Sequence, residues 1–510
     1  MSPTRMLEPL PAGGRRVDTP GESIGRHAAG GAFWMLLAFG ASKGLSFATS
    51  MVLARLLSPS EFGVVSFAMV GIGAFNLLQN FGVPAAIVHG ERDIRETGGT
   101  ALTINLVAAA ALFVATVALA PTLAEFGGQE VIAPVMVALA SGLILTALGS
   151  VHNAVLIKRL AFRRKLVPDV APLVASGLVS IVMALSGFGV WSLVAAYLIK
   201  EGTSTILLWL LSSIRPWPRF RWPIAAELLR YGRHVSLTGL VGFASSNVDY
   251  FIVGHALGTA RLGVYALAFM LANVPAVIMI QAISNVTFSA YSRVRSKRGE
   301  LIDLFGDAFT VSSTLAGLLG VFLFAAGPYY VPLLLGPKWN DAVVPLQILV
   351  VYGVFRAMYS NFSSVYRAVG RPDAEWQLSL GRLVVLVPAL VIATQHGITA
   401  VAAAQSAVML CFVPVTGLVL LRLVDAPADH VRGIMAPPLA AGAAAAALVG
   451  GVYAQPDLRM LAQGQVGSVV LAAAGGAVYV GTLLRLNRRT ARLARVLAGT
   501  LGGRLRGAGR

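Results

Sequence analysis

The sequence has few charged residues and a single cysteine. Only 12% of its 510 residues are charged, against roughly 25% in soluble domains. Cys411 has no second cysteine to pair with, which excludes an internal disulfide framework. Residues 1–30 hold no apolar core of a cleaved signal peptide, so we expect the first span to direct its own insertion. These shortages argue against a soluble or disulfide-stapled protein.

Patterns of catalytic residues are lacking as well. The chain holds no phosphate-cradling glycine loop, no nucleophile elbow and no metal-ligand spacing of Cys, His and carboxylates. The longest connectors predicted on the outer face, 327–340 and 454–463, carry no paired acids. We therefore predict neither an enzyme nor a cofactor. A membrane-bound polysaccharide polymerase or ligase is the weaker alternative.

Apolar residues make up 56% of the chain and fall in long runs. Runs of about 20 residues recur from Gly31 to Arg485, and such a run crosses the hydrocarbon core as a helix. The fold class predicted from this pattern is an all-α integral membrane protein with about 14 transmembrane helices. The predicted spans are 31–53, 62–88, 98–121, 130–157, 166–187, 189–212, 235–256, 262–290, 302–326, 341–366, 376–395, 398–421, 434–453 and 464–484.

The basic residues alternate between the loops. With the N-terminus in the cytoplasm, thirty-two of the 40 Lys and Arg residues fall in the inner segments and four in the outer ones. This bias predicts that both termini are cytoplasmic. The net charge of +18 therefore marks the inner membrane face, where it meets anionic lipid, and we expect no nucleic-acid partner.

Two stretches of the chain resemble each other at a separation of two hundred residues. Residues 52–70 read VLARLLSPSEFGVVSFAMV and residues 252–270 read IVGHALGTARLGVYALAFM, with Gly63 aligned to Gly263. Six predicted spans separate the copies, so both point the same way across the membrane. This predicts two six-helix bundles in a parallel pseudo-two-fold repeat, plus two C-terminal helices.

The repeat divides the chain into predicted segments. The central basic stretch, which includes RPWPRFRWP, is predicted to be an interfacial linker between the two lobes. The segments are a disordered cytoplasmic tail at 1–30, an N-lobe at 31–212, the linker at 213–234, a C-lobe at 235–421, two further spans at 422–484 and a basic cytoplasmic tail at 485–510.

Four segments resemble a known family. They read VLARLLSPSEFG, LRYGRHVSLTGLVGFASSNVDYFIVGHALGTARLGVYALAFM, YVPLLLGPKWNDAVVPLQIL and YRAVGRPD. They are similar to segments of the polysaccharide transporter family, within the multidrug/oligosaccharidyl-lipid/polysaccharide exporter superfamily. The resemblance implies a flippase of the bacterial cytoplasmic membrane. Its cargo would be undecaprenyl-diphosphate-linked oligosaccharide for O-antigen, colanic acid or exopolysaccharide, and polysaccharide-assembly proteins would be possible partners.

Ionisable side chains inside the spans are the first candidates for a transport site, because they are costly in the membrane. Lys43 and Arg356 lie near the middle of spans on opposite sides of the repeat and would suit a diphosphate. Lys200 is followed directly by Glu201 and can pair locally, and Arg382 can reach the cytoplasmic surface. All four are predicted substrate-binding residues, with structural ion pairing as the alternative. The candidate sugar contacts are Tyr352, Tyr359, Asn76, Asn80, Gln281 and Asn285.

Asp249 is an acidic residue deep within an apolar span. It can couple transport to an H⁺ or Na⁺ gradient, or it can pair with Lys43 and hold the lobes together. The sequence leaves both readings open.

A multidrug/cation antiporter of the same superfamily is the main alternative function. Such a cavity would be rich in acids. Here the deep charges are the four cations named above against Asp249 and Glu201, which favours an anionic substrate.

Overall fold

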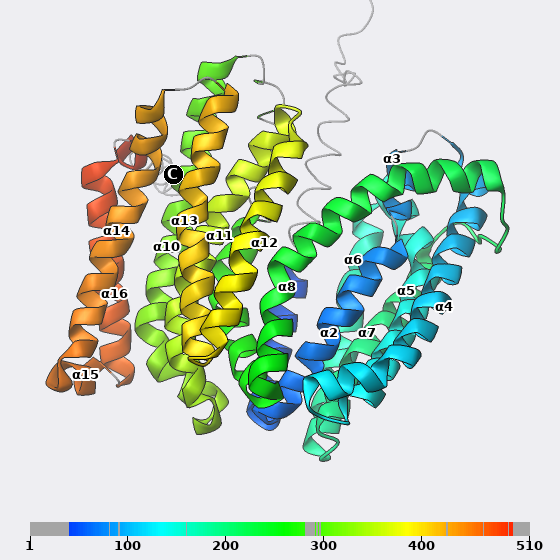
Figure 1. Cartoon of the computed structure of the whole chain (residues 1–510), viewed down its shortest axis with the longest axis horizontal. Coiled ribbons are helices and arrows are strands. Elements are labelled where there is room, and N and C mark those ends of the chain that lie inside the picture. The colour runs from blue at the N-terminus through cyan, green and yellow to red at the C-terminus, as the bar shows by residue number, and fades with distance from the viewer. Residues whose placement is uncertain are drawn as a thin grey trace, which may run out of the picture.

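The structure is a computed structural model that describes residues 40–80, 82–89, 92–159, 161–280, 291, 294, 297–424, 427–462, 464–487 and 489–492. Within these ranges every regular element is helical (Figure 1). Helical residues 40–56 precede the labelled elements. These are α2 (Pro59–Asn80), α3 (Val83–His89), α4 (Ile94–Gly127), α5 (Ile132–Lys158), α6 (Phe162–Leu185), α7 (Val190–Leu211), α8 (Trp222–Ala272), α10 (Arg298–Leu335), the 3₁₀ helix η1 (Pro337–Ala342), α11 (Val343–Ala368), α12 (Pro372–Thr394), α13 (Ile398–Val424), α14 (Ala428–Ala454), α15 (Pro456–Ala462) and α16 (Gln465–Leu486).

The all-α membrane class is confirmed, whereas the count of fourteen spans is not reproduced. Twelve helices of the described chain are long and apolar enough to cross a membrane. The first predicted span is described only from residue 40. The predicted span 235–256 and the first part of the predicted span 262–290 run together in α8, which is two helices joined at a kink where Gly258 has φ of 81°. Because the kink interrupts the helix without a loop, length and composition count it as one span.

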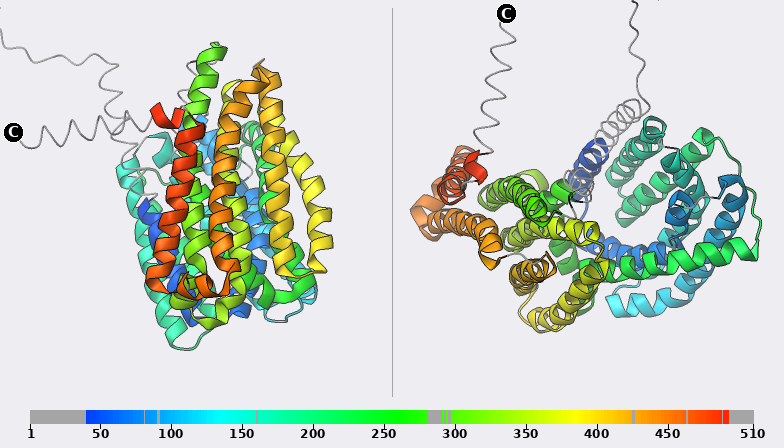
Figure 2. Two further views of the ribbon diagram at one scale, coloured as in Figure 1. Left: turned by 90° about the vertical axis from the view of Figure 1, so that its left-hand side faces the viewer. Right: turned by 90° about the horizontal axis from the view of Figure 1, so that it is seen from above.

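The helices form two groups (Figure 1). In the first, which we call the N-lobe, α2, α4, α5, α6 and α7 pack on one another together with helix 40–56. In the second, the C-lobe, α11 packs on α10 and α13, and α12 on α13. The pair α14 and α16 packs on α10 at the far edge of the C-lobe, as the view from above in Figure 2 shows. The predicted domain boundaries stay predictions.

The long helix α8 joins the two lobes. It contacts α2, α3 and α4 on one side and α11, α12 and α13 on the other. Residues 213–221, part of the predicted basic linker, are not helical, and α8 begins at Trp222. Trp217, Phe220 and Trp222 are all more than half exposed, as expected for a segment lying at a membrane interface.

The two repeated stretches touch each other reciprocally. A Cβ on Gly63 would lie 1.7 Å from the carbonyl oxygen of Thr259, and a Cβ on Gly263 would lie 1.8 Å from that of Pro59. The two contacts are equivalent: adding two hundred to the numbers of Gly63 and Pro59 gives Gly263 and Thr259. A local two-fold axis produces such a pair of contacts. Only glycine permits this approach of two backbones. The glycines that aligned in sequence therefore sit at the crossing of α2 and α8.

A seam of hydrogen bonds continues this contact between the lobes. The Arg55 guanidinium donates to the carbonyls of Leu333 and Leu334 at 3.0 and 2.7 Å, and Lys338 Nζ donates to the Arg55 carbonyl at 2.8 Å. The fully buried Trp339 donates its indole N–H to the Ala54 carbonyl at 2.8 Å. Each lobe thus caps carbonyls at a helix end of the other. We call these residues the outer seam, since the charge pattern predicts that they face outward.

Prolines inside two helices create hydrogen-bond acceptors that neighbouring helices use. Pro172 lacks an N–H, which leaves the carbonyl four residues earlier without its helical donor, and Ser204 of α7 donates to that carbonyl of Pro168 at 3.1 Å. In the same way Pro328 frees the carbonyl of Phe324, which accepts from Gln347 of α11 at 2.9 Å. Both bonds fix helix pairs inside the lobes.

Candidate functional site

Arg356 lies in α11 among buried aromatic residues. Its Nη1 donates to the hydroxyl of Tyr352, one turn earlier, at 3.3 Å, and its guanidinium carbon lies 5.9 Å from that ring's centroid. Tyr352 is buried and its ring packs 5.2 Å from that of Phe269 in α8. Arg356 itself is half-buried. A cation held in this way keeps most of its five N–H donors available for an anion.

Asp249 lies in α8, facing the same region. It is only 1% exposed, and its Oδ2 accepts a 2.7 Å hydrogen bond from Tyr265, beyond the kink in the same helix. The other oxygen, Oδ1, has no hydrogen-bond partner in the described structure. Arg356 exerts a favourable Coulomb interaction on Asp249, but no ion pair joins them among the described residues. The described contact of Asp249 is thus with a hydroxyl, and the choice between coupling and pairing with Lys43 stays a prediction.

Arg382 of α12 is anchored to α8. Its Nη2 donates to the Ser245 hydroxyl at 2.6 Å and to the Ser245 carbonyl at 2.9 Å. The side chain is half-buried, as is that of Tyr359 in α11. Arg382 therefore points toward α8 in the structure, and part of its hydrogen-bonding capacity is already used there.

The predicted N-lobe cations occupy different settings. Lys200 forms an ion pair with its neighbour Glu201 at 2.8 Å, as the local alternative predicted. Lys43 is exposed on helix 40–56. Its neighbour Ser42 donates to the Asp169 carbonyl of α6 at 3.3 Å, so this helix runs along α6. The role of both lysines in binding stays a prediction.

Asn76 and Asn80 stand one turn apart on α2. Asn80 Nδ2 donates at 2.9 Å to both the carbonyl and the side-chain oxygen of Asn76. Gln281 and Asn285, the two remaining predicted sugar contacts, lie outside the described residues.

Asn80 also lines a polar cavity of about 280 Å³ inside the N-lobe, which we call the N-lobe cavity. The sequence pattern does not indicate this cavity, because its walls come from five helices. Asp169 lines this cavity beside Lys165. The lining residues are Asn80, Pro84, Thr146, Gly149, Ser150, Asn153, Lys165, Asp169, Glu201, Ser204, Thr205 and Leu208.

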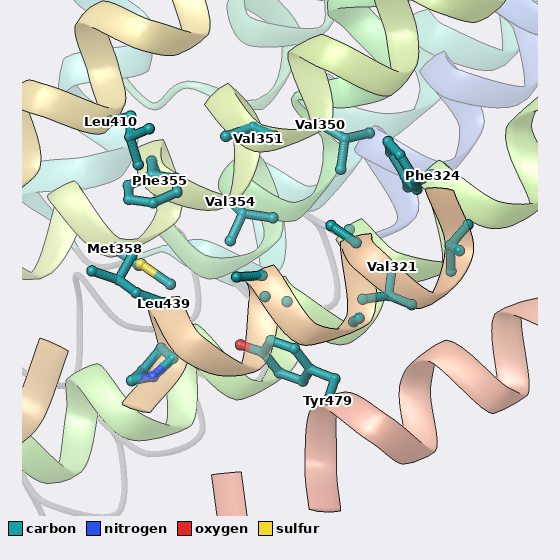
Figure 3. A pocket seen from close by; sticks show the side chains of 18 residues that line it. Val321, Phe324, Val350, Val351, Val354, Phe355, Met358, Leu410, Leu439 and Tyr479 are labelled. Carbon is teal, nitrogen blue, oxygen red and sulfur yellow. The ribbon is translucent and has the colours of Figure 1, made fainter. Parts of the chain in front are cut away.

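A second pocket, of about 350 Å³, has the opposite character. It lies where α10 and α11 of the C-lobe meet α14 and α16, and Figure 3 shows its aliphatic and aromatic walls. The Tyr479 hydroxyl, its main polar group, donates to the Ser313 carbonyl at 2.8 Å. We call it the apolar pocket. Its lining includes Val321, Phe324, Val350, Val354, Phe355, Met358, Leu439, Gly442 and Tyr479.

No group of three or more Cys, His, Asp or Glu side chains arranged to hold a metal occurs among the described residues.

The sequence is similar to those of known proteins. Residues 52–344 match the family model described as "Polysaccharide biosynthesis protein". The chain is 24% identical to the Escherichia coli lipopolysaccharide biosynthesis protein WzxC over 72% of its own length and 75% of that protein's. It is 24% identical to the Rhizobium meliloti succinoglycan biosynthesis transport protein ExoT over 66% and 68%.

Solved structures share the fold at low sequence identity. The lipid II flippase MurJ in an inward closed conformation superimposes with a TM-score of 0.67 at 13% identity, covering 88% of this chain and 99% of MurJ. An inward-facing multidrug transporter of the MATE family gives 0.61 at 17% identity, covering 75% and 94%. The matched family model covers more than half of the sequence, and the chain is therefore a multi-pass membrane protein that belongs to the polysaccharide biosynthesis protein family.

Proposed function

We propose that the protein is a flippase that exports undecaprenyl-diphosphate-linked oligosaccharide repeat units for surface polysaccharide synthesis. The observation that carries the proposal is Arg356, a half-buried cation at membrane depth with donors to spare, in a member of this family. A lipid-linked sugar diphosphate carries negative charges that need such a partner away from water. A drug-cation antiporter would need the opposite charge.

The apolar pocket supports the lipid part of the proposed substrate. A polyprenyl chain needs an apolar surface that stays continuous while the charged headgroup leaves the aqueous phase. The pocket lies beside α11, which carries Arg356 and also lines the pocket with Val354, Phe355 and Met358. One helix would thus contact both the diphosphate and the lipid.

Transport would follow alternating access, with both termini in the cytoplasm. The outer seam joins the lobes in the described state, so export requires that it open while the lobes close on the other side. Coupling to an H⁺ or Na⁺ gradient would use Asp249, whose Oδ1 is buried without a described partner. Protonation or ion binding there changes a buried charge, which is costly enough to bias one state.

The decisive experiment is reconstitution into proteoliposomes with a fluorescent undecaprenyl-diphosphate oligosaccharide. We expect the lipid to change leaflet in a protein-dependent manner, measured by protection from a membrane-impermeant quencher. An imposed H⁺ or Na⁺ gradient should accelerate the wild type and leave Asp249→Asn unaffected. Ethidium transport without lipid movement would instead establish the antiporter.

A further inference from the structure

The N-lobe cavity lies at one end of the lobe and is lined by five helices. Its walls come from α2, α3, α5, α6 and α7, whose contributing residues lie in the halves of these helices that the charge pattern places toward the cytoplasm. A substrate made in the cytoplasm would reach this side first. The cavity is distinct from the apolar pocket, which lies between the C-lobe and the pair α14 and α16.

We propose that the N-lobe cavity is the subsite for a neutral sugar ring of the lipid-linked oligosaccharide. The inference rests on the proposed function and deepens it. The lining offers amides, hydroxyls, carboxylates and one ammonium in a volume of about 280 Å³. This is close to the lower end, about 300 Å³, of pockets that hold small organic ligands.

The charges of the lining favour a sugar over a bare cation. Both oxygens of Asp169 already accept from Lys165, at 2.6 and 2.8 Å, and Glu201 is paired with Lys200 at 2.8 Å. Paired carboxylates attract a further cation weakly but still accept hydrogen bonds from hydroxyls. The volume is also many times the roughly 10–15 Å³ that a single water molecule requires, which is far more room than an ion needs.

The charge balance also selects among sugars. Two carboxylates and one ammonium line the cavity, since Lys200 is not part of the lining. A uronic acid would bring a third carboxylate into a confined space and be disfavoured. A neutral hexose or N-acetylated sugar would exchange water for fixed donors and acceptors at little electrostatic cost.

The walls are held in place before any ligand binds. Ser204 donates to the Pro168 carbonyl at 3.1 Å, and Thr205 donates to the Leu145 carbonyl at 2.7 Å, so α7 is tied to α6 and α5. Asn80 is held by Asn76. In contrast, Asn153 makes no hydrogen bond within the described chain and is available to a ligand. Such preorganisation reduces the entropy lost on binding.

The test compares three lipids on the purified full chain in nanodiscs: undecaprenyl diphosphate, the same lipid carrying glucose, and the same lipid carrying glucuronate. We expect glucose to raise affinity over the bare lipid about tenfold, the gain from one or two net hydrogen bonds. Asn153→Leu should remove that gain and leave bare-lipid affinity unchanged. Ser141→Ala, on the same helix but bonded to its own Ala138 carbonyl, should behave as wild type.

Glu201→Gln supplies an independent readout, since it keeps the side-chain shape. We expect wild type to prefer glucose-linked over glucuronate-linked lipid and Glu201→Gln to reduce that preference. No gain from glucose in wild type, or a gain that survives Asn153→Leu with the preference unchanged in Glu201→Gln, would overturn the sugar subsite. Those results would leave the flippase proposal standing, whereas failure of all three lipids to bind would remove both.

Discussion

The two lobes meet through matching glycines but enclose opposite chemistry. The N-lobe holds a polar cavity of about 280 Å³, while the C-lobe and its two attached helices hold an apolar pocket of about 350 Å³. At their crossing, Gly63 and Gly263 make equivalent contacts two hundred residues apart. The repeat thus gives the two lobes equivalent contacts at their crossing, whereas the cavity and the pocket lie where the lobes differ. An amphiphile with a sugar head and a lipid tail matches this division.

A cross-link across the lobes should produce the largest effect. The Ser60 and Thr259 hydroxyl oxygens are 3.4 Å apart at the crossing of α2 and α8, next to the outer seam, so cysteines at these positions can form a disulfide. In a Cys411→Ser background, we expect oxidation of Ser60→Cys/Thr259→Cys to stop lipid flipping completely and a reductant to restore it. The assay is quencher protection in proteoliposomes.

Each single-cysteine variant is the control for that cross-link and should be insensitive to oxidant. If the oxidised double variant still flipped lipid, the lobes would not need to separate here. The polar cavity and the apolar pocket would then belong to two lobes that do not move apart at this contact during transport.

Removal of the Arg356 side chain should be next in size. We expect Arg356→Ala to slow flipping about a hundredfold, since the diphosphate loses its charged partner away from water. Arg356→Lys should retain part of the rate, because it keeps the charge without the planar fork. Arg459→Ala, in the short helix α15, is the control. A normal flipping rate in Arg356→Ala would mean that Arg356 does not bind the diphosphate. The apolar pocket would then have no phosphate site beside it.

Filling the apolar pocket should cost less. A Cβ on Gly442 would have no atom within 4 Å, so Gly442→Leu can occupy the pocket without a backbone clash. We expect about a tenfold slower flipping of full-length undecaprenyl substrates, and a smaller loss for short-chain analogues that need less of the pocket. Gly451→Leu, on the same helix and also without neighbours, is the matched control. Equal losses in the two variants would assign the effect to helix packing.

Helix positions and the repeat could be predicted from the sequence because both depend on local signals. A run of about 20 apolar residues indicates a span by its length alone. The aligned glycines at 63 and 263 indicated the repeat, and in the structure they make close backbone contacts between α2 and α8. The break predicted between residues 256 and 262 is present as the kink at Gly258, but it has no loop, so the two segments run on as one labelled helix.

The compartments could not be predicted, because they depend on how helices pack. Asp169 and Glu201 come from different helices, and their spacing along the chain does not indicate that they line the same cavity. The lining of the apolar pocket uses the same residue types as packed core, so a pattern of hydrophobicity does not distinguish a filled space from an empty one. Lys200 was the exception: its partner was adjacent in sequence, and the predicted local pair is present at 2.8 Å.

The smallest effect should come from loosening one wall of the N-lobe cavity. Ser204→Ala removes the donor to the Pro168 carbonyl, which Pro172 has already deprived of its helical partner. We expect a loss of about 1 kcal/mol in stability, because one buried acceptor loses its bond. This should lower the thermal unfolding midpoint and weaken glucose-linked lipid more than bare lipid. Ser186→Ala, whose exposed hydroxyl bonds within its own helix end, should change neither quantity. An equal weakening of both lipids by Ser204→Ala would mean that the polar and apolar compartments do not divide the substrate between them.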